Sequence, residues 1–115
     1  QHIRTSSSVM PFHSAHRLSA KGETRSQTTW DLMDDWIKNY RGLCVTNGQG
    51  AWAYVFVDFP GAYYASAAGR DSHYLQFKIA TGLKDAGFRW YELGEGHTPG
   101  ITTFKRGLAN AMVEP

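Results

Sequence analysis

One segment of the chain follows a helical hydrophobic period more clearly than any other. Across residues 24–40, apolar side chains recur every three or four positions, and acidic side chains fill most of the other half of a helical wheel. The apolar half consists of Trp30, Leu32, Met33, Trp36, Ile37 and Tyr40. Thr28 followed by Asp31 has the spacing of a capping box, with Asp in place of Glu, and marks the start of a helix. This helix must bury one face against a core.

The next part of the chain changes to an extended pattern. Residues 42–46, 51–58 and 63–68 are rich in β-branched or aromatic side chains, which favour strands. The segments 47–50 and 59–61 between them contain glycines and a proline, so they supply the positive φ angles and the fixed bend that tight turns need. The three strands are therefore expected to form an antiparallel meander.

A second helix and a fourth strand follow the meander. Asp71 or Ser72 can cap a helix that runs to about Ala86, with a narrow apolar stripe along one side. The strand predicted at residues 88–93 comes directly after this helix, so it can pair in parallel with an earlier strand. The fold class expected is α/β (α+β): a mixed sheet made of the antiparallel meander and a parallel crossover strand, with helices on both faces.

The two ends of the chain carry weaker patterns. Residues 1–11 are polar and are expected to be a flexible arm or a truncated linker with little structure, followed by a short helix at 12–20 that Gly22 stops. A last short helix is expected at 102–109 and a final strand at 111–113. Because the chain opens with glutamine instead of methionine, we expect it to be a truncated chain, a processed product or a fragment of a larger reading frame.

Composition and charge exclude several classes of protein. With 115 residues, 42% of them hydrophobic, the chain has the apolar content of one globular domain. The formal charge is +2 and the basic residues are scattered among acidic ones, so no duplex-DNA binder is indicated. Cys44 is the only cysteine, which favours a reducing, cytoplasmic location, and no apolar run is long enough to span a bilayer. We interpret Cys44 as a small buried hydrophobic residue.

The order of the predicted elements matches the core of GNAT acyltransferases, although many α+β folds share that order. Residues 87–109, GFRWYELGEGHTPGITTFKRGLA, resemble a run in the FemAB family of aminoacyl and peptidyl transferases. The matching positions here are Tyr91, Glu92, Leu93, Gly94, Gly100, Ile101, Phe104, Lys105, Arg106 and Gly107. Residues 12–109 resemble the second, GNAT-type half of these proteins in order, so 12–115 is taken as the acyltransferase-type domain. Family members usually carry another domain before it.

The resemblance implies transfer of an activated acyl group in bacterial cell wall or polysaccharide precursor synthesis. The donor would be aminoacyl-tRNA or another activated acyl donor, and the acceptor an amine on a peptidoglycan or polysaccharide precursor. The family's Phe-Lys pair carries over to Phe104 as a packing platform for the donor terminus and to Lys105 as the cation that stabilises the oxyanion. Arg106 and Gly100 of the same run are counted with the substrate-binding positions. The alternative for Phe104 to Arg106 is a buried helix anchor beside solvated charges.

Three further side chains are candidates for the same site. Tyr63 and Tyr64 point to opposite faces of a strand where the family places acceptor-binding tyrosines, so one can be core while the other reaches the cleft. His97, in a glycine-rich loop near Glu92 and Glu95, could accept a proton from the attacking amine. The alternatives are packing for the tyrosines and an ordinary loop position for the histidine.

Neither a CoA cofactor nor a metal is indicated. CoA-using GNAT enzymes carry a glycine-rich turn before the helix that follows the fourth strand, whereas this chain has only Gly69 and Arg70 there, followed by Asp71. Acetyl-CoA is therefore disfavoured, and no cofactor is predicted. His13 and His16 form an HxxH pair, yet zinc needs three or four ligands, so we interpret them as surface or packing residues.

Two rival functions are left open. The first is a non-catalytic binding or dimerisation module that kept the GNAT scaffold and lost its partner domain. An exposed strand edge at 111–113 would let such a module associate as a homodimer. The second is an acetyl-CoA-dependent enzyme with a divergent pyrophosphate turn.

Overall fold

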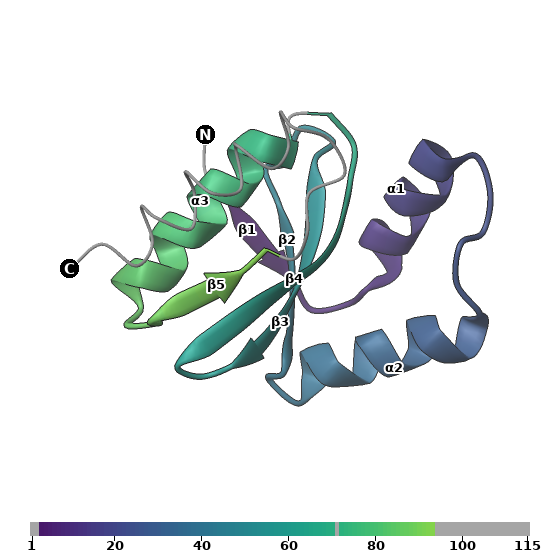
Figure 1. The fold of residues 1–115 in the computed structure, drawn as a ribbon. Coiled ribbons are helices and arrows are strands. Elements are labelled where there is room, and N and C mark those ends of the chain that lie inside the picture. Colours follow the sequence, from purple (N-terminus) through teal and green to yellow (C-terminus); the bar gives the residue numbers. More distant parts are fainter. Residues whose placement is uncertain (1–2, 71, 94–115) are drawn as a thin grey trace.

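The computed structural model describes residues 3–70 and 72–93, in which a five-stranded sheet lies between helices (Figure 1). The elements in chain order are β1 (Arg4–Ser6), α1 (Met10–Ala20), α2 (Gln27–Lys38), β2 (Gly42–Thr46), β3 (Trp52–Asp58), β4 (Gly61–Ala68), α3 (Ser72–Asp85) and β5 (Trp90–Glu92). Strands that follow one another in sequence are also neighbours in the sheet, in the order β1-β2-β3-β4-β5. The mixed sheet expected from the sequence is confirmed.

From β2 onward, the direction of each strand pair fits the length of its connection. Short turns join β2 to β3 and β3 to β4, and these pairs are antiparallel, whereas α3 separates β4 from β5, which pair in parallel. In Figure 1, α3 covers one face of the sheet, while α1 and α2 lie against the other. Among the helices of residues 3–93, none combines the length and apolarity that a bilayer crossing would require.

The face covered by α3 has an aliphatic core. Leu75, Ile79 and Leu83 recur every four residues on α3, so they form one stripe, and all three are buried. The stripe packs against alternate residues of the central strands, including Ala53 and Val55 of β3. This helix and its stripe agree with the pattern predicted from the sequence.

The opposite face has an aromatic core. Phe12 of α1, Trp30 of α2 and Tyr54 of β3 are fully buried together, and Phe12 lies within 6.1 Å of both other rings, centroid to centroid. The Tyr54 hydroxyl donates a hydrogen bond of 2.5 Å to the Met33 carbonyl oxygen, which satisfies the phenol in the core. Cys44 is buried in the same cluster, in agreement with the interpretation of the sequence.

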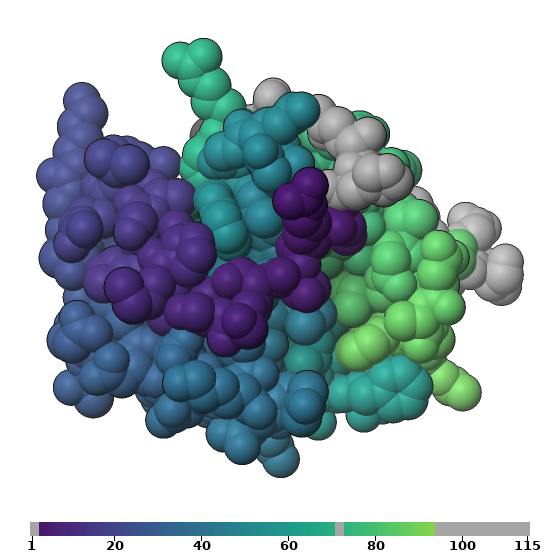
Figure 2. All heavy atoms as spheres, turned by 180° about the vertical axis from the view of Figure 1, so that it is seen from behind, coloured from purple at the N-terminus to yellow at the C-terminus, as the bar shows by residue number. Residues whose placement is uncertain are grey.

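The N-terminal segment is more ordered than expected, because residues 1–11 were predicted to have little structure. Residues Arg4–Ser6 pair with β2 in antiparallel register, and α1 begins at Met10. The backbone N–H of Val9 donates to Asp34 Oδ1 on α2 at 2.8 Å, and the Val9 side chain is buried. In Figure 2 this segment is dark purple and lies on the surface, next to the blue residues of α2 and β2. Its side chains are mostly exposed, so its hydrophobic pattern could not reveal the strand.

The N-cap of helix α2 lies two residues before the predicted one. Ser26 is the N-cap in place of Thr28, and its hydroxyl accepts a hydrogen bond of 3.2 Å from the backbone N–H of Thr29. Ser, Thr and Asp can all cap a helix, so composition alone did not decide between them. The helix predicted at 102–109 and the strand predicted at 111–113 lie outside the described residues.

Candidate functional site

β4 is longer than its neighbour β5 in the described residues. β5 pairs with the first three residues of β4, from Gly61 opposite Trp90 to Tyr63 opposite Glu92. β4 continues to Ala68, and beyond Tyr63 no strand of the described residues pairs with it on that side. This stretch of β4, together with the end of β5, is called the β4–β5 opening.

A β-bulge lies at the same place. The register between β3 and β4 shifts between Tyr54 and Val55, which pair with Ser66 and Tyr64, so Ala65 is the extra residue on β4. A bulge bends its strand and redirects the residues around it, and bulges are frequent next to active sites. The bulge therefore lies close to the point where the pairing of β4 with β5 ends.

Two tyrosines flank this opening on the α3 side. Tyr64 is partly buried against the aliphatic core, and burial raises the pKa of its phenol, while the positive charge of Arg25 acts in the opposite direction and is the smaller effect. Tyr91 of β5 is buried, its hydroxyl donates to Gln76 Oε1 of α3 at 2.5 Å, and burial also raises its pKa. Both phenols therefore stay protonated at neutral pH.

Tyr63 and Tyr64 lie on opposite faces of β4, as the sequence predicts. Tyr63 pairs with Phe56 and Glu92 and is 37% exposed, whereas Tyr64 packs against the α3-side core. Tyr64 is the member of the pair next to the bulge. That either phenol contacts a substrate stays a prediction.

The connection between α1 and α2 is held by consecutive side chains on the other face of the sheet. Glu23 bonds to His13 Nε2 at 2.8 Å, and Thr24 Oγ1 lies 3.0 Å from His16 Nδ1. Arg25 Nη1 lies 3.5 Å from His16 Nε2, and the Arg25 guanidinium carbon is 5.0 Å from the centroid of the Trp30 ring. This connection is thereby fixed against both helices.

These contacts determine the protonation of His16. A guanidinium can only donate, so His16 Nε2 must accept from Arg25, and the ring hydrogen lies on Nδ1, where it donates to Thr24 Oγ1. Burial lowers the pKa of His16, and the charges of Arg25 and His13 lower it further, while Glu23 raises it. His16 is therefore neutral at pH 7.

His13 and His16, predicted to be surface or packing residues, do pack in the protein. The His13 ring stacks on Trp30, with 4.1 Å between centroids and 15° between planes, and His16 meets the same indole edge-on. The contact of His16 with Arg25 could not be predicted, because residues 23–25 carry no hydrophobic period or motif. No group of three or more metal-ligating side chains occurs among residues 3–70 and 72–93.

The turn between β4 and α3 is built for an internal contact. Gly69 has a φ of 87°, and a Cβ at this position would collide with the Gly50 carbonyl oxygen in the β2–β3 turn. Its backbone N–H donates to Ser19 Oγ of α1 at 3.1 Å. The glycine and its amide are thus both engaged within the protein, so the Gly69 N–H is not free to hold a pyrophosphate oxygen.

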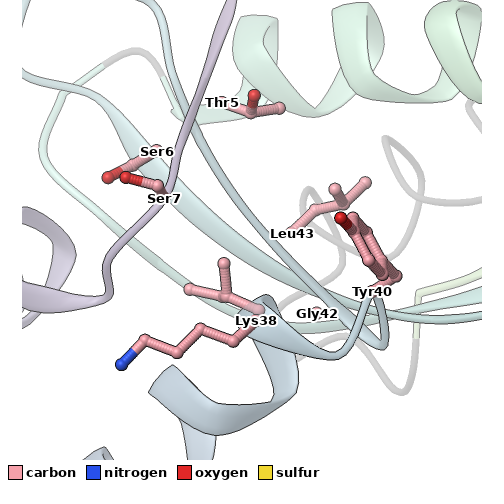
Figure 3. A pocket seen from close by; sticks show the side chains of 8 residues that line it. Thr5, Ser6, Ser7, Lys38, Tyr40, Gly42 and Leu43 are labelled. Carbon is pink, nitrogen blue, oxygen red and sulfur yellow. The ribbon is translucent and has the colours of Figure 1, made fainter.

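A groove of about 510 Å³ lies at the far edge of the sheet (Figure 3). It is lined by Thr5, Ser6, Ser7, Ile37, Lys38, Tyr40, Gly42 and Leu43. Its polar groups are partly engaged, since Ser6 Oγ donates to the Ser8 carbonyl oxygen and Lys38 pairs with Asp34 at 2.9 Å. β1 and β2 form this edge, and β3 separates them from the β4–β5 opening, so the groove is not part of that site.

The remaining predicted site residues lie outside the described part of the chain. These are His97, Gly100, Phe104, Lys105 and Arg106. Of the predicted candidates, the structure therefore describes Tyr63 and Tyr64, and it adds Tyr91 and its partner Gln76 on the α3 side.

Comparisons with known proteins support the fold. No protein-family model matches the sequence, and no curated protein matches it. Among solved structures, an acetyltransferase of Bacillus subtilis in complex with CoA superposes with a TM-score of 0.61. The match has 13% sequence identity and covers 93% of this chain and 74% of the other. At this identity the likeness shows the fold alone, and the chain has a GNAT-like α/β fold.

Proposed function

We propose that this domain is an N-acyltransferase whose activated donor lies at the opening between β4 and β5. The observation that carries the proposal is the coincidence of three features: β5 ends at Glu92, β4 bulges at Ala65, and the protonated phenol of Tyr64 lies beside both. An acyl carbonyl seated there would meet backbone N–H groups of β4 and the phenol as hydrogen-bond donors.

The reaction proposed is direct aminolysis. The acceptor amine forms a C–N bond to the acyl carbon, the carbonyl oxygen takes up negative charge, and the bond to the leaving oxygen then breaks. The amine gives up a proton, and the leaving oxygen gains one. Tyr64 would stabilise the oxyanion by donating its phenolic hydrogen, which it retains at neutral pH. His97 as proton acceptor and Lys105 as a second oxyanion-stabilising group remain part of this proposal.

An aminoacyl ester is the proposed donor. This choice is supported by the resemblance of residues 87–109 to FemAB proteins and by the engaged amide of Gly69, which disfavours a pyrophosphate. Phe104, Arg106 and Gly100 are proposed to hold the donor terminus, and Tyr63 to face the acceptor. An amine on a peptidoglycan or polysaccharide precursor is the acceptor class that the same resemblance suggests.

A transfer assay with a short aminoacyl-RNA mimic and a diamine tests the proposal. Removing one oxyanion donor typically costs about 10²- to 10³-fold in rate, so Tyr64→Phe is expected to lose activity on this scale. Tyr40→Phe, a change at an exposed residue on the far edge of the sheet, should leave the rate unchanged. Equal rates for wild type and Tyr64→Phe would remove the phenol from the mechanism, and absence of transfer by the folded wild type would contradict the proposal.

An acetyl-CoA-dependent enzyme is the second candidate, because the similar Bacillus subtilis acetyltransferase was solved with CoA. A ligand that binds only the folded state raises the melting temperature by mass action. Stabilisation by saturating CoA, together with acetyl transfer from acetyl-CoA, would favour this candidate over the aminoacyl ester. No thermal shift at saturating CoA would exclude it.

A further inference from the structure

Arg25 is a fixed cation without a counter-ion among the described residues. Its guanidinium lies over the Trp30 ring and against His16 Nε2, and its side chain is partly buried. Neither of the ion pairs found in residues 3–70 and 72–93 includes it, since they join His13 to Glu23 and Lys38 to Asp34. The nearby carboxylate of Glu23 is bonded to His13 instead.

This arrangement suits the binding of an anion. A partly buried charge is costly without a partner, and a guanidinium presents several N–H donors in a plane that matches carboxylate and phosphate oxygens. The indole beneath Arg25 and the imidazole beside it hold the side chain in place, so less conformational freedom is lost when a ligand binds. The neutral state of His16 leaves Arg25 as the charged member of the pair.

Arg25 lies in the α1–α2 connection, on the face of the sheet that carries the aromatic core, and it contacts one side chain from each helix. We propose that Arg25, held by Trp30 and His16, binds an anionic oxygen group, a carboxylate or a phosphate, on this face of the sheet. This anion site does not depend on the proposed acyl transfer.

His16 should couple anion binding to pH. The groups that act on it are Arg25 and His13, which lower its pKa together with burial, and Glu23, which raises it. A bound anion would offset the charge of Arg25 and so raise the pKa of His16. Linkage then requires that the anion binds more tightly as the pH falls below about 6.5, where His16 can take up a proton.

The test is titration of the whole chain with inorganic phosphate and, separately, with acetate, followed by the indole N–H resonance of Trp30. The Trp30 side chain lies beneath Arg25, and its Nε1 has no hydrogen-bond partner among the described residues, so its shift should respond to the site. The wild type is expected to show a saturable shift with one or both anions. Arg25→Gln should weaken binding about tenfold or more, and Arg25→Lys less.

Arg41→Gln is the matched control, because Arg41 is exposed and precedes β2 at the opposite end of α2. It should bind as the wild type does. A saturable wild-type shift that persists unchanged in Arg25→Gln, or no shift with either anion, would overturn the proposal. Arg25→Lys keeps the positive charge, so it provides the comparison with the wild type if Arg25→Gln does not fold. Anion binding without any acyl transfer would leave this site standing and contradict the proposed function alone.

Discussion

The two faces of the sheet are built from different kinds of side chain. Against α3 the core consists largely of Leu, Ile, Val and Ala residues, with Tyr91 as its buried phenol. Against α1 and α2 it consists largely of aromatic residues, and histidines and Arg25 surround the buried indole of Trp30. The contacts of the first face depend mainly on volume, whereas many contacts of the second depend on direction and charge.

This difference indicates a division of roles. Aliphatic packing stabilises the fold without specifying chemistry, and the aromatic face fixes polar groups in defined positions. Tyr64 of the β4–β5 opening packs on the α3 side, whereas Arg25 contacts Trp30 and His16 on the other. Substitutions on the two faces should therefore separate stability from ligand binding.

The largest loss of stability is expected from Leu75→Ala. Leu75 is fully buried in the aliphatic core, and Leu-to-Ala changes in such positions cost about 2–5 kcal/mol of unfolding free energy. Leu18→Ala, at a residue 80% exposed on α1, should cost almost nothing. Urea denaturation measures both. A small effect of Leu75→Ala would show that the α3 face does not carry the stability assigned to it.

Gly69→Ala should disrupt the contact between α1 and the turn that precedes α3. The residue would adopt a left-handed φ, at about 1–2 kcal/mol, and its Cβ would collide with the Gly50 carbonyl oxygen in addition. Gly48→Ala is the control, because Gly48 has a similar φ of 75° and an added Cβ would meet no atom within 4 Å. Thermal unfolding should show the larger loss for Gly69→Ala, and equal losses would contradict the close contact.

Tyr54→Phe tests a directional contact of the aromatic face. The change removes the hydrogen bond from the buried hydroxyl to the Met33 carbonyl oxygen, at about 1 kcal/mol. Tyr74→Phe, at a half-exposed position of α3, should change the unfolding free energy much less. If both variants were as stable as the wild type, the hydrogen bond would be contributing nothing measurable.

The smallest expected effect is a change in stability with pH. The pKa of His16 is lowered in the folded protein from its usual 6.5, so the unfolded chain binds the proton more readily. Stability should therefore fall as the pH drops below about 6.5, and His16→Gln should reduce this slope. Asp34, whose pKa is lowered by Lys38 and the Val9 N–H, adds a separate loss only below about pH 4. An identical slope near pH 6 in His16→Gln would contradict the assignment.

Most elements of the fold could be predicted because their periods are local. The α3 stripe and the strands β2 and β3 lie where the pattern placed them, within one residue. β1 could not be predicted, since its three residues are mostly exposed and become a strand only by pairing with β2. Arg25 was missed for a related reason: its partners lie on the helices before and after it, and no motif joins them.

The most direct test of the donor site is to titrate the chain with an aminoacyl-RNA mimic while following its backbone amide resonances. The account predicts the largest shifts at Tyr64, Ala65 and Ser66 around the bulge, and at Tyr91 of β5. Shifts confined to the groove at Thr5 and Leu43, with β4 unchanged, would contradict the assignment of the β4–β5 opening as the site of acyl transfer.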